Sequence, residues 1–233
     1  DLDNDGDMDI AQTGYNDALE ARFYTYTNNG DGSFTDYWPG LSGIALSAVD
    51  WGDLDHDGDL DFVAGNLGLN YKYKASEDEP FEVYYYDFDN NGSKDIVLAY
   101  YNFGTEFPLR GFSCSSSQVP GLKEKFKKYE SFAAADVIEV YGKRSIERSL
   151  NYSAKTFASS YIENLGNGKF SIRKLPVKAQ FSSINDILID DYNSDAHLDL
   201  LIAGNLFNSE IETARNDAGQ GLLMLGDGKG NFE

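Results

Sequence analysis

The sequence predicts an all-β fold built from a repeated four-stranded unit, and two motifs that recur along its 233 residues carry this prediction. The first is an acidic nonapeptide, found at 1–9, 53–61, 87–95 and 191–199. The second is a glycine-rich turn that ends in phenylalanine, found at 28–34, 164–170 and 226–232. Short apolar or aromatic runs flank both motifs, so a unit reads strand, acidic loop, strand, connection, strand, glycine hairpin, strand. Four strands repeated at roughly 40–50 residues are typical of a β-propeller blade.

In chain order the repeats predict four blades, at about 1–38, 44–102, 103–175 and 181–233. The boundary between the second and third blades is the weakest, because the third acidic loop follows soon after the second. That loop could instead belong to a second hairpin of the same blade. Both ends of the chain fall inside a blade, so we expect residues 1–233 to form part of a larger ring.

Residues 104–157 interrupt the pattern, and we expect them to form a mainly helical insertion. Pro120 is expected to begin one helix, Gly142 to end the next, and Ser145 to cap a third. The insertion is basic within an acidic chain, and four of its lysines lie close together: Lys123, Lys125, Lys127 and Lys128. They form a solvated face or pair with an acidic blade, or else they form a docking site for an acidic partner.

The acidic loops are predicted to bind up to four calcium ions. Calcium takes six to eight oxygen ligands at about 2.3–2.6 Å, and side-chain oxygens at positions 1, 3, 5 and 9 of a tight loop suit it. Position 7 would supply its backbone carbonyl, which explains why its side chain varies. The candidate ligands are Asp1, Asp3, Asp5, Asp7, Asp9, Asp53, Asp55, Asp57, Asp59, Asp61, Asp87, Asp89, Asn91, Ser93, Asp95, Asp191, Asn193, Asp195, His197 and Asp199.

The four loops differ in their expected strength. The loop 53–61 is the most complete, and 87–95 follows it. The loop 1–9 lacks its incoming strand, so its ligand set is expected to be truncated. The loop 191–199 is expected to be the weakest, because Asn193 removes a charge and Ala196 replaces the glycine of position 6.

An EF-hand shares the first half of this pattern but does not fit the rest. Its loop closes with a glutamate at position 12 and lies between two helices. Position 12 here holds other residues, namely Gln12, Ala64, Leu98 and Ile202. The runs that follow position 9 are short and apolar, which indicates that the loops join strand to strand.

Charge and composition limit the function. The formal net charge of −20 disfavours nucleic acid and anionic membranes as partners. No apolar run is long enough for a transmembrane segment, and the single cysteine, Cys114, excludes an internal disulfide. Calcium is abundant outside the cytosol, so we expect an extracytoplasmic protein of the cell surface, outer membrane or periplasm, with a signal peptide or lipid anchor in its full-length precursor.

Together, the calcium loops and glycine hairpins resemble the FG-GAP/VCBS repeat family, whose propellers include the integrin α-subunit head. A closer resemblance, to bacterial envelope VCBS-repeat proteins of the Bacteroidetes type that often carry an ASPIC/UnbV domain, rests on Asn66–Asn70, Asp87–Gly92, Asn164–Phe170, Ala179–Ser182 and Leu223–Phe232. The resemblance implies a propeller in which calcium is structural and lies in loops on one face.

The expected function is that of a calcium-stabilised binding or assembly module that recognises a protein or a glycan in the cell envelope. Two long connections are the candidate recognition elements: Asn66–Pro80 and Asn205–Gln220. A calcium-dependent polysaccharide lyase is the main alternative, and a purely structural subunit of an outer-membrane complex is the second. No catalytic residues are predicted, because both histidines, His56 and His197, lie inside acidic loops and no nucleophilic serine motif is present.

Overall fold

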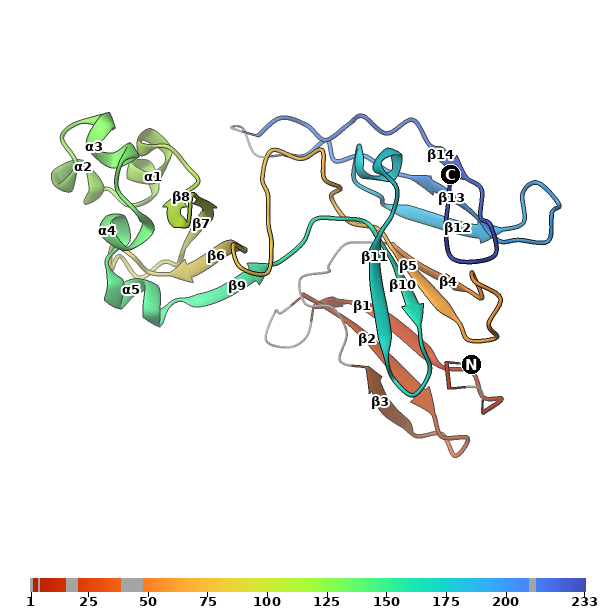
Figure 1. The fold of residues 1–233 in the computed structure, drawn as a ribbon. Helices are drawn as coiled ribbons and strands as arrows, with labels where there is room; N and C mark the ends of the chain where they lie inside the picture. The colour runs from red at the N-terminus through yellow and green to blue at the C-terminus, as the bar shows by residue number, and fades with distance from the viewer. Residues whose placement is uncertain (1, 4, 16–20, 39–47, 210–212) are drawn as a thin grey trace. The chain divides into compact units, whose positions relative to one another are not determined.

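The computed structural model describes residues 2–3, 5–15, 21–38, 48–209 and 213–233. The chain divides into two compact units. The major unit contains residues 1–72 and 157–233, and the inserted unit contains residues 73–156. Described residues form antiparallel sheets with few helices (Figure 1), which confirms the prediction of a mostly β structure.

The described residues of the major unit form three antiparallel sheets. The first sheet has the order β1-β2-β3, formed by β1 (Ile10–Tyr15), β2 (Ala21–Asn28) and β3 (Phe34–Trp38). The second has the order β11-β10-β5-β4, formed by β4 (Val49–Gly52), β5 (Asp61–Ala64), β10 (Ser160–Asn164) and β11 (Phe170–Lys174). The third has the order β12-β13-β14, formed by β12 (Asp186–Asp190), β13 (Asp199–Ala203) and β14 (Leu222–Met224).

The inner strands of the second sheet, β5 and β10, are buried on both faces. All four residues of β5 are buried, and successive side chains of a strand point to opposite faces. Val63 packs in a cluster with Leu200 and Met224 of the third sheet. Phe62 packs in a different cluster, which includes Leu2 of the first acidic loop. The two clusters therefore cover opposite faces of one central sheet.

The inserted unit contains the fourth sheet, of order β8-β7-β6-β9, and five short helices. Its strands are β6 (Phe81–Tyr86), β7 (Asp95–Asn102), β8 (Thr105–Pro108) and β9 (Leu150–Ala154). Its helices are α1 (Phe112–Gln118), α2 (Leu122–Lys125), α3 (Tyr129–Ala133), α4 (Val137–Tyr141) and α5 (Lys143–Arg148). A core of Val119, Leu122, Phe132, Ala135 and Val140 holds the helices together, and Phe88 of the third acidic loop packs against it.

The strands of the expected blades 44–102 and 103–175 are distributed differently in the structure. The first range combines β4 and β5 with β6 and β7, which belong to another sheet. The second range combines β8 and β9 with β10 and β11 in the same way. The physical reason is the pairing of β5 with β10, in which Ala64 lies opposite Ser160. This pairing joins two strands that are separated in sequence by the whole inserted unit. The spacing of the repeats therefore does not predict it.

The helix ends also correct one expectation. Helix α4 begins with a capping box formed by Asp136 and Glu139 and ends at Gly142, as its glycine indicates. Gly142, with a φ of 87°, also precedes the first turn of α5, so Ser145 lies inside that helix and does not cap it. Lys125 donates to the carbonyl of Val140 at 3.1 Å, and Lys127 pairs with Glu124 at 3.1 Å, so two of the four clustered lysines have partners within their own unit.

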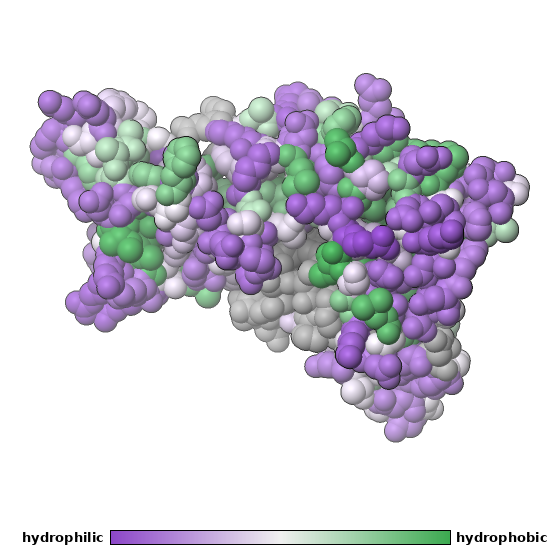
Figure 2. All heavy atoms as spheres, viewed as in Figure 1, coloured by the Kyte–Doolittle hydropathy of each residue, from purple (hydrophilic) through white to green (hydrophobic). Residues whose placement is uncertain are grey.

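The surface is consistent with the acidic composition. In the view of Figure 2 it is mainly hydrophilic and carries small, separate hydrophobic patches. No helix among the described residues is long and apolar enough to cross a membrane. The 3-10 helix η1 (Val177–Gln180) is the helical turn of the major unit that borders the cavity described below.

Candidate metal site in the acidic loops

The acidic loops share one backbone conformation. Position 4 adopts the left-handed region in three of them, with φ values of 63° at His56, 60° at Asn90 and 62° at Ser194. Position 6 also has a positive φ, of 98° at Gly58 and 69° at Ala196. Ala196 therefore takes up the conformation that favours glycine, at the cost of strain from its Cβ.

Side-chain oxygens of the loops turn inward, because they accept hydrogen bonds from amides two residues later. In the second loop, Asp57 N donates to Asp55 Oδ1 at 3.2 Å, and Asp59 N donates to Asp57 Oδ1 at 2.9 Å. The fourth loop repeats the pattern, since His197 N donates to Asp195 Oδ1 at 2.9 Å. These turns hold the acidic side chains on the inner side of the loop before any ion binds.

Two loops bring three carboxylates together. One oxygen each from Asp53, Asp55 and Asp57 lie within 4.8 Å of one another, and so do oxygens of Asp87, Asp89 and Asp95. Within the described ranges these are the groups of three acidic or metal-ligating side chains that meet this distance. These are the two loops that the sequence predicts to bind calcium most strongly.

Electrostatics in the second loop favour a cation. Burial and the neighbouring Asp57 carboxylate raise the pKa of Asp55 above its usual value. Asp53 Oδ1 is buried and has no hydrogen-bond partner. Because a buried polar atom without a partner is costly, a cation at this point would satisfy Asp53 and relieve the repulsion. The residues present therefore fit a hard divalent ion bound by oxygen.

Position 9 has a second role that the sequence did not reveal. The buried Asp61 accepts hydrogen bonds from Leu54 N at 3.2 Å, from Asn164 N at 2.8 Å and from the Tyr161 hydroxyl at 2.7 Å. Burial raises its pKa to about 6, against the opposing effect of these hydrogen bonds. Leu54 belongs to the same acidic loop, whereas Asn164 begins the glycine hairpin. Asp61 therefore clamps the acidic loop to the hairpin.

The same clamp recurs in the other two sheets of the major unit. Asp9 accepts from the amides of Leu2 and Asn28. Asp199 accepts from Tyr192 N at 3.0 Å and from Gly226 N at 2.8 Å. In every case one donor is position 2 of the acidic loop and the other is the first residue of the hairpin. The two sequence motifs are thus two halves of one structural element.

The side chain at position 7 of each acidic loop lies so close to the hairpin that one hairpin residue must be glycine. A Cβ built on Gly30 would lie 2.6 Å from Asp7 Oδ2, and one on Gly166 would lie 3.3 Å from Asp59 Oδ2. A Cβ on Gly228 would lie 2.4 Å from His197 Nδ1. The side chain of position 7 therefore packs over the hairpin, in addition to the role predicted for its carbonyl.

Position 2 couples neighbouring sheets. Leu2 and Leu54 are buried in the clusters of the second and third sheets, respectively. Their carbonyls accept hydrogen bonds from the hairpin of that next sheet, from Asn164 Nδ2 at 3.3 Å and from Gly230 N at 3.2 Å. Tyr192, at the same position of the fourth loop, is 41% exposed.

The predicted ligands of the first and fourth loops do not form such a group of three carboxylates among the described residues. Asp1 lies outside the described residues, while Asp3 and Asp5 lie in the first loop without forming a group of three described carboxylates. In the fourth loop Asn193 Nδ2 donates to Asp195 at 2.8 Å, and Asp191 accepts from the amides of Asp195 and Ala196. The loop is therefore held by its own hydrogen bonds.

Both connections predicted to recognise a partner are held by hydrogen bonds, which in Asn205–Gln220 include two backbone bonds between Leu206 and Asn216. Gly68 N donates to Phe157 O at 2.7 Å, Asn70 N donates to Gln180 O at 2.9 Å, and Tyr71 packs on Phe157. Residues 66–71 are therefore held against Phe157 and the end of η1. In the other connection Phe207 is 58% exposed, and Glu210 lies outside the described residues.

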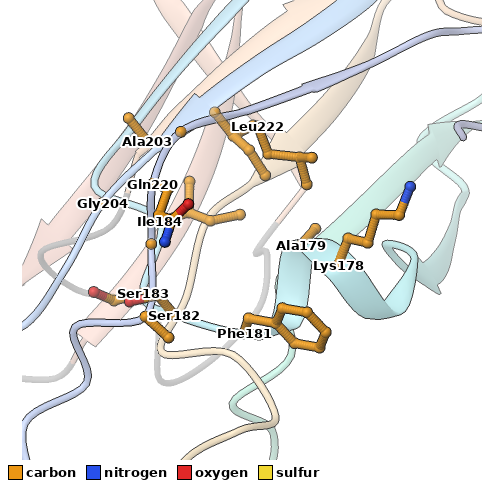
Figure 3. Close-up of a pocket in the computed structure, with 14 residues that line it drawn as sticks. Lys178, Ala179, Phe181, Ser182, Ser183, Ile184, Ala203, Gly204, Gln220 and Leu222 are labelled. Carbon is orange, nitrogen blue, oxygen red and sulfur yellow. The ribbon is translucent and has the colours of Figure 1, made fainter.

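A cavity of about 360 Å³ lies between η1 and the ends of the third sheet (Figure 3). Ala179, Ile184 and Leu222 surround its apolar part, and Phe181 lies at its edge. Lys178 is the one ionisable side chain among its lining residues. The cavity is therefore suited to binding through shape and apolar contact rather than through paired carboxylates.

Antiparallel sheets joined by acidic loops and glycine hairpins define a β-rich repeat protein. Residues 1–64 match the family model of the FG-GAP-like repeat. This range contains the first two acidic loops, the first glycine hairpin and the strands β1–β5. No curated protein and no solved structure matches the chain.

Proposed function

We propose that this protein is a calcium-stabilised β-propeller module that acts in binding or assembly in the cell envelope. The observation that carries the proposal is the clamp of position 9, which occurs in all three sheets of the major unit and ties each acidic loop to a hairpin. An ion in such a loop would stabilise the loop, the hairpin and the contact with the next sheet together.

The proposed ions are calcium. Asp53, Asp55 and Asp57 would hold one, together with the carbonyl of Asp59. Asp87, Asp89 and Asp95 would hold another, with Asn91 and the carbonyl of Ser93 completing the set. Oxygen ligands without nitrogen or sulfur favour calcium or magnesium, and a flexible loop favours calcium.

Sheets of the major unit would be successive blades. Support comes from the repeated contact in which position 2 of one loop enters the core of the next sheet. The outer face of the third sheet carries a cross-strand row of Leu188, Leu201 and Leu223, which are 54%, 37% and 45% exposed. A further blade or a partner protein would cover this row, as the second sheet is covered.

The proposed location is the cell surface, outer membrane or periplasm, where calcium is plentiful. The proposed partner is an envelope protein complex or a glycan, with the cavity beside Phe181 as a point of contact. Kinship with Bacteroidetes-type VCBS-repeat proteins that carry an ASPIC/UnbV domain is part of the same proposal. Co-purification from native membranes would identify a protein partner, and glycan-array binding would identify a sugar.

Thermal unfolding with and without a chelator tests the calcium assignment. At a free concentration one hundred times Kd, each independent site should stabilise the fold by about 2.7 kcal/mol. We expect EGTA to lower the melting temperature and added calcium to restore it. The variant Asp57→Asn should show a smaller response, whereas Asp217→Asn, an exposed aspartate outside the loops, should respond like the parent. An unchanged melt together with no metal by elemental analysis would refute the assignment.

A further inference from the structure

The two histidines of the chain meet each other, although they lie far apart in sequence. His56 is position 4 of the second acidic loop, and His197 is position 7 of the fourth. Their ring centroids are 5.1 Å apart, with an angle of 42° between the rings. The chain has no other histidine, so all of its imidazole groups are at this one point.

Backbone contacts between the second and third sheets bring the rings together. β4 and β12 are neighbours, and Ile189 N donates to the carboxylate of Asp50 at 3.1 Å. The two acidic loops follow these strands directly and so lie side by side. Gly230 N donates to Leu54 O at 3.2 Å and holds the second loop from the other side. The contact between the rings is therefore held by both sheets.

The surroundings of His197 leave one of its two ring nitrogens for an ion. Its Nδ1 is buried against Gly228, so Nε2 is the nitrogen available to an ion shared with His56. The many carboxylates of the two loops also raise the local concentration of cations.

We propose that His56 and His197 form a transition-metal site, selective for an ion such as Zn²⁺, that is separate from the oxygen sites of the loops. Imidazole nitrogen binds zinc at about 2.0–2.1 Å, and two imidazoles on one tetrahedral ion have ring centroids roughly 5 Å apart. Calcium prefers oxygen and does not compete for these ligands. Water fills the remaining coordination positions, so the site is open to an additional ligand. A bound ion links the loops of two sheets.

Metal titration of the calcium-saturated protein tests this site. Excess calcium occupies oxygen sites, so we expect isothermal titration with Zn²⁺ to show one binding event in the parent protein. His56→Gln and His197→Gln should each weaken that event by more than about tenfold. Lys229→Gln, an exposed change in the neighbouring hairpin, should leave it unchanged. His56 is exposed at the tip of its loop, so its variant carries the test if His197→Gln fails to fold.

Electron paramagnetic resonance with Cu²⁺ counts the ligands directly. Nitrogen hyperfine structure should report two imidazoles in the parent protein and one in either variant. The proposal is overturned if the calcium-saturated parent binds no Zn²⁺, if the histidine variants bind it as tightly as the parent, or if the Cu²⁺ spectrum shows oxygen ligands alone. None of these outcomes depends on the propeller proposal or on the function of the module.

Discussion

At the scale of single residues, the aspartates of one motif perform two different tasks. Asp53, Asp55 and Asp57 face one another and have the geometry of an ion site. Asp61 is buried and uses both carboxylate oxygens as hydrogen-bond acceptors for its own loop, the hairpin and Tyr161. The spacing of the motif predicts where acidic groups gather, but it does not show which of them is directed at the neighbouring hairpin.

The substitution Asp61→Asn distinguishes the role of this clamp from the role of the ion site. Asp61→Asn keeps the size of the side chain but replaces one acceptor with a donor that faces backbone N–H groups. We expect this change to destabilise the fold by about 1–3 kcal/mol both in calcium and in EGTA. Asp57→Asn should instead lower stability mainly in calcium. Chemical denaturation of both variants under the two conditions measures the difference, and equal calcium dependence would contradict the division of roles.

At the scale of elements, local patterns predicted the strands and missed their partners. The apolar runs after position 9 correspond to β5, β7 and β13, and the glycine turns correspond to the hairpins β2–β3 and β10–β11. The pairing of β5 with β10 depends on packing across the inserted unit, which no local pattern records. The clamp of position 9 was missed for a similar reason, because one of its donors comes from the glycine hairpin. In the case of Asp61 and Asn164, that hairpin lies about one hundred residues away in sequence.

The fourth sheet contains an acidic cluster that makes its stability depend on pH. Tyr84 donates from its hydroxyl to Glu106 Oε1 at 2.7 Å, and Glu82 is buried nearby. Burial, followed by the charge of Glu82, raises the pKa of Glu106 against the effect of the Tyr84 hydrogen bond. The neutral carboxyl is therefore favoured more in the folded state than in the unfolded state.

The sign of the pH effect follows from this raised pKa. The contribution of Glu106 to stability is fully present below its unfolded pKa and is lost as pH rises through the higher folded value. We expect Glu106→Gln to flatten the loss of stability over that pH range. The control Glu130→Gln, at an exposed position, should leave the pH profile of urea unfolding unchanged. An identical profile for Glu106→Gln would contradict this assignment.

At the scale of the whole molecule, the two points at which the chain of the major unit is interrupted by the inserted unit lie close together. Gly68 N donates to Phe157 O, and the ring of Tyr71 packs on that of Phe157. The inserted unit has its own clusters, in which Phe88, at position 2 of its acidic loop, packs on Tyr141 at 5.0 Å between ring centroids. Position 2 of this loop is thus covered by helices of its own unit, whereas position 2 of the first two loops is covered by a neighbouring sheet.

Replacing residues 73–156 with a short glycine-serine linker tests this independence. Loop insertions and deletions of this kind cost little when the ends lie close together. We expect the shortened protein to keep the antiparallel β spectrum and the calcium response of the loop 53–61. Calcium binding should fall by the single site at 87–95, as measured by equilibrium dialysis. Loss of the fold would show that the second sheet needs the inserted unit for its stability.

The split of the second sheet also affects the order in which the protein folds during synthesis. β5 is complete at Ala64, but its partner β10 begins only at Ser160. At roughly 5–20 residues per second, a ribosome needs about 5–20 s to supply that partner. Until then the nascent hairpin β4–β5 exposes an edge whose residues Phe62 and Val63 are fully buried in the finished protein. The inserted unit, with its local contacts, can fold during this interval, and the central sheet is completed after it.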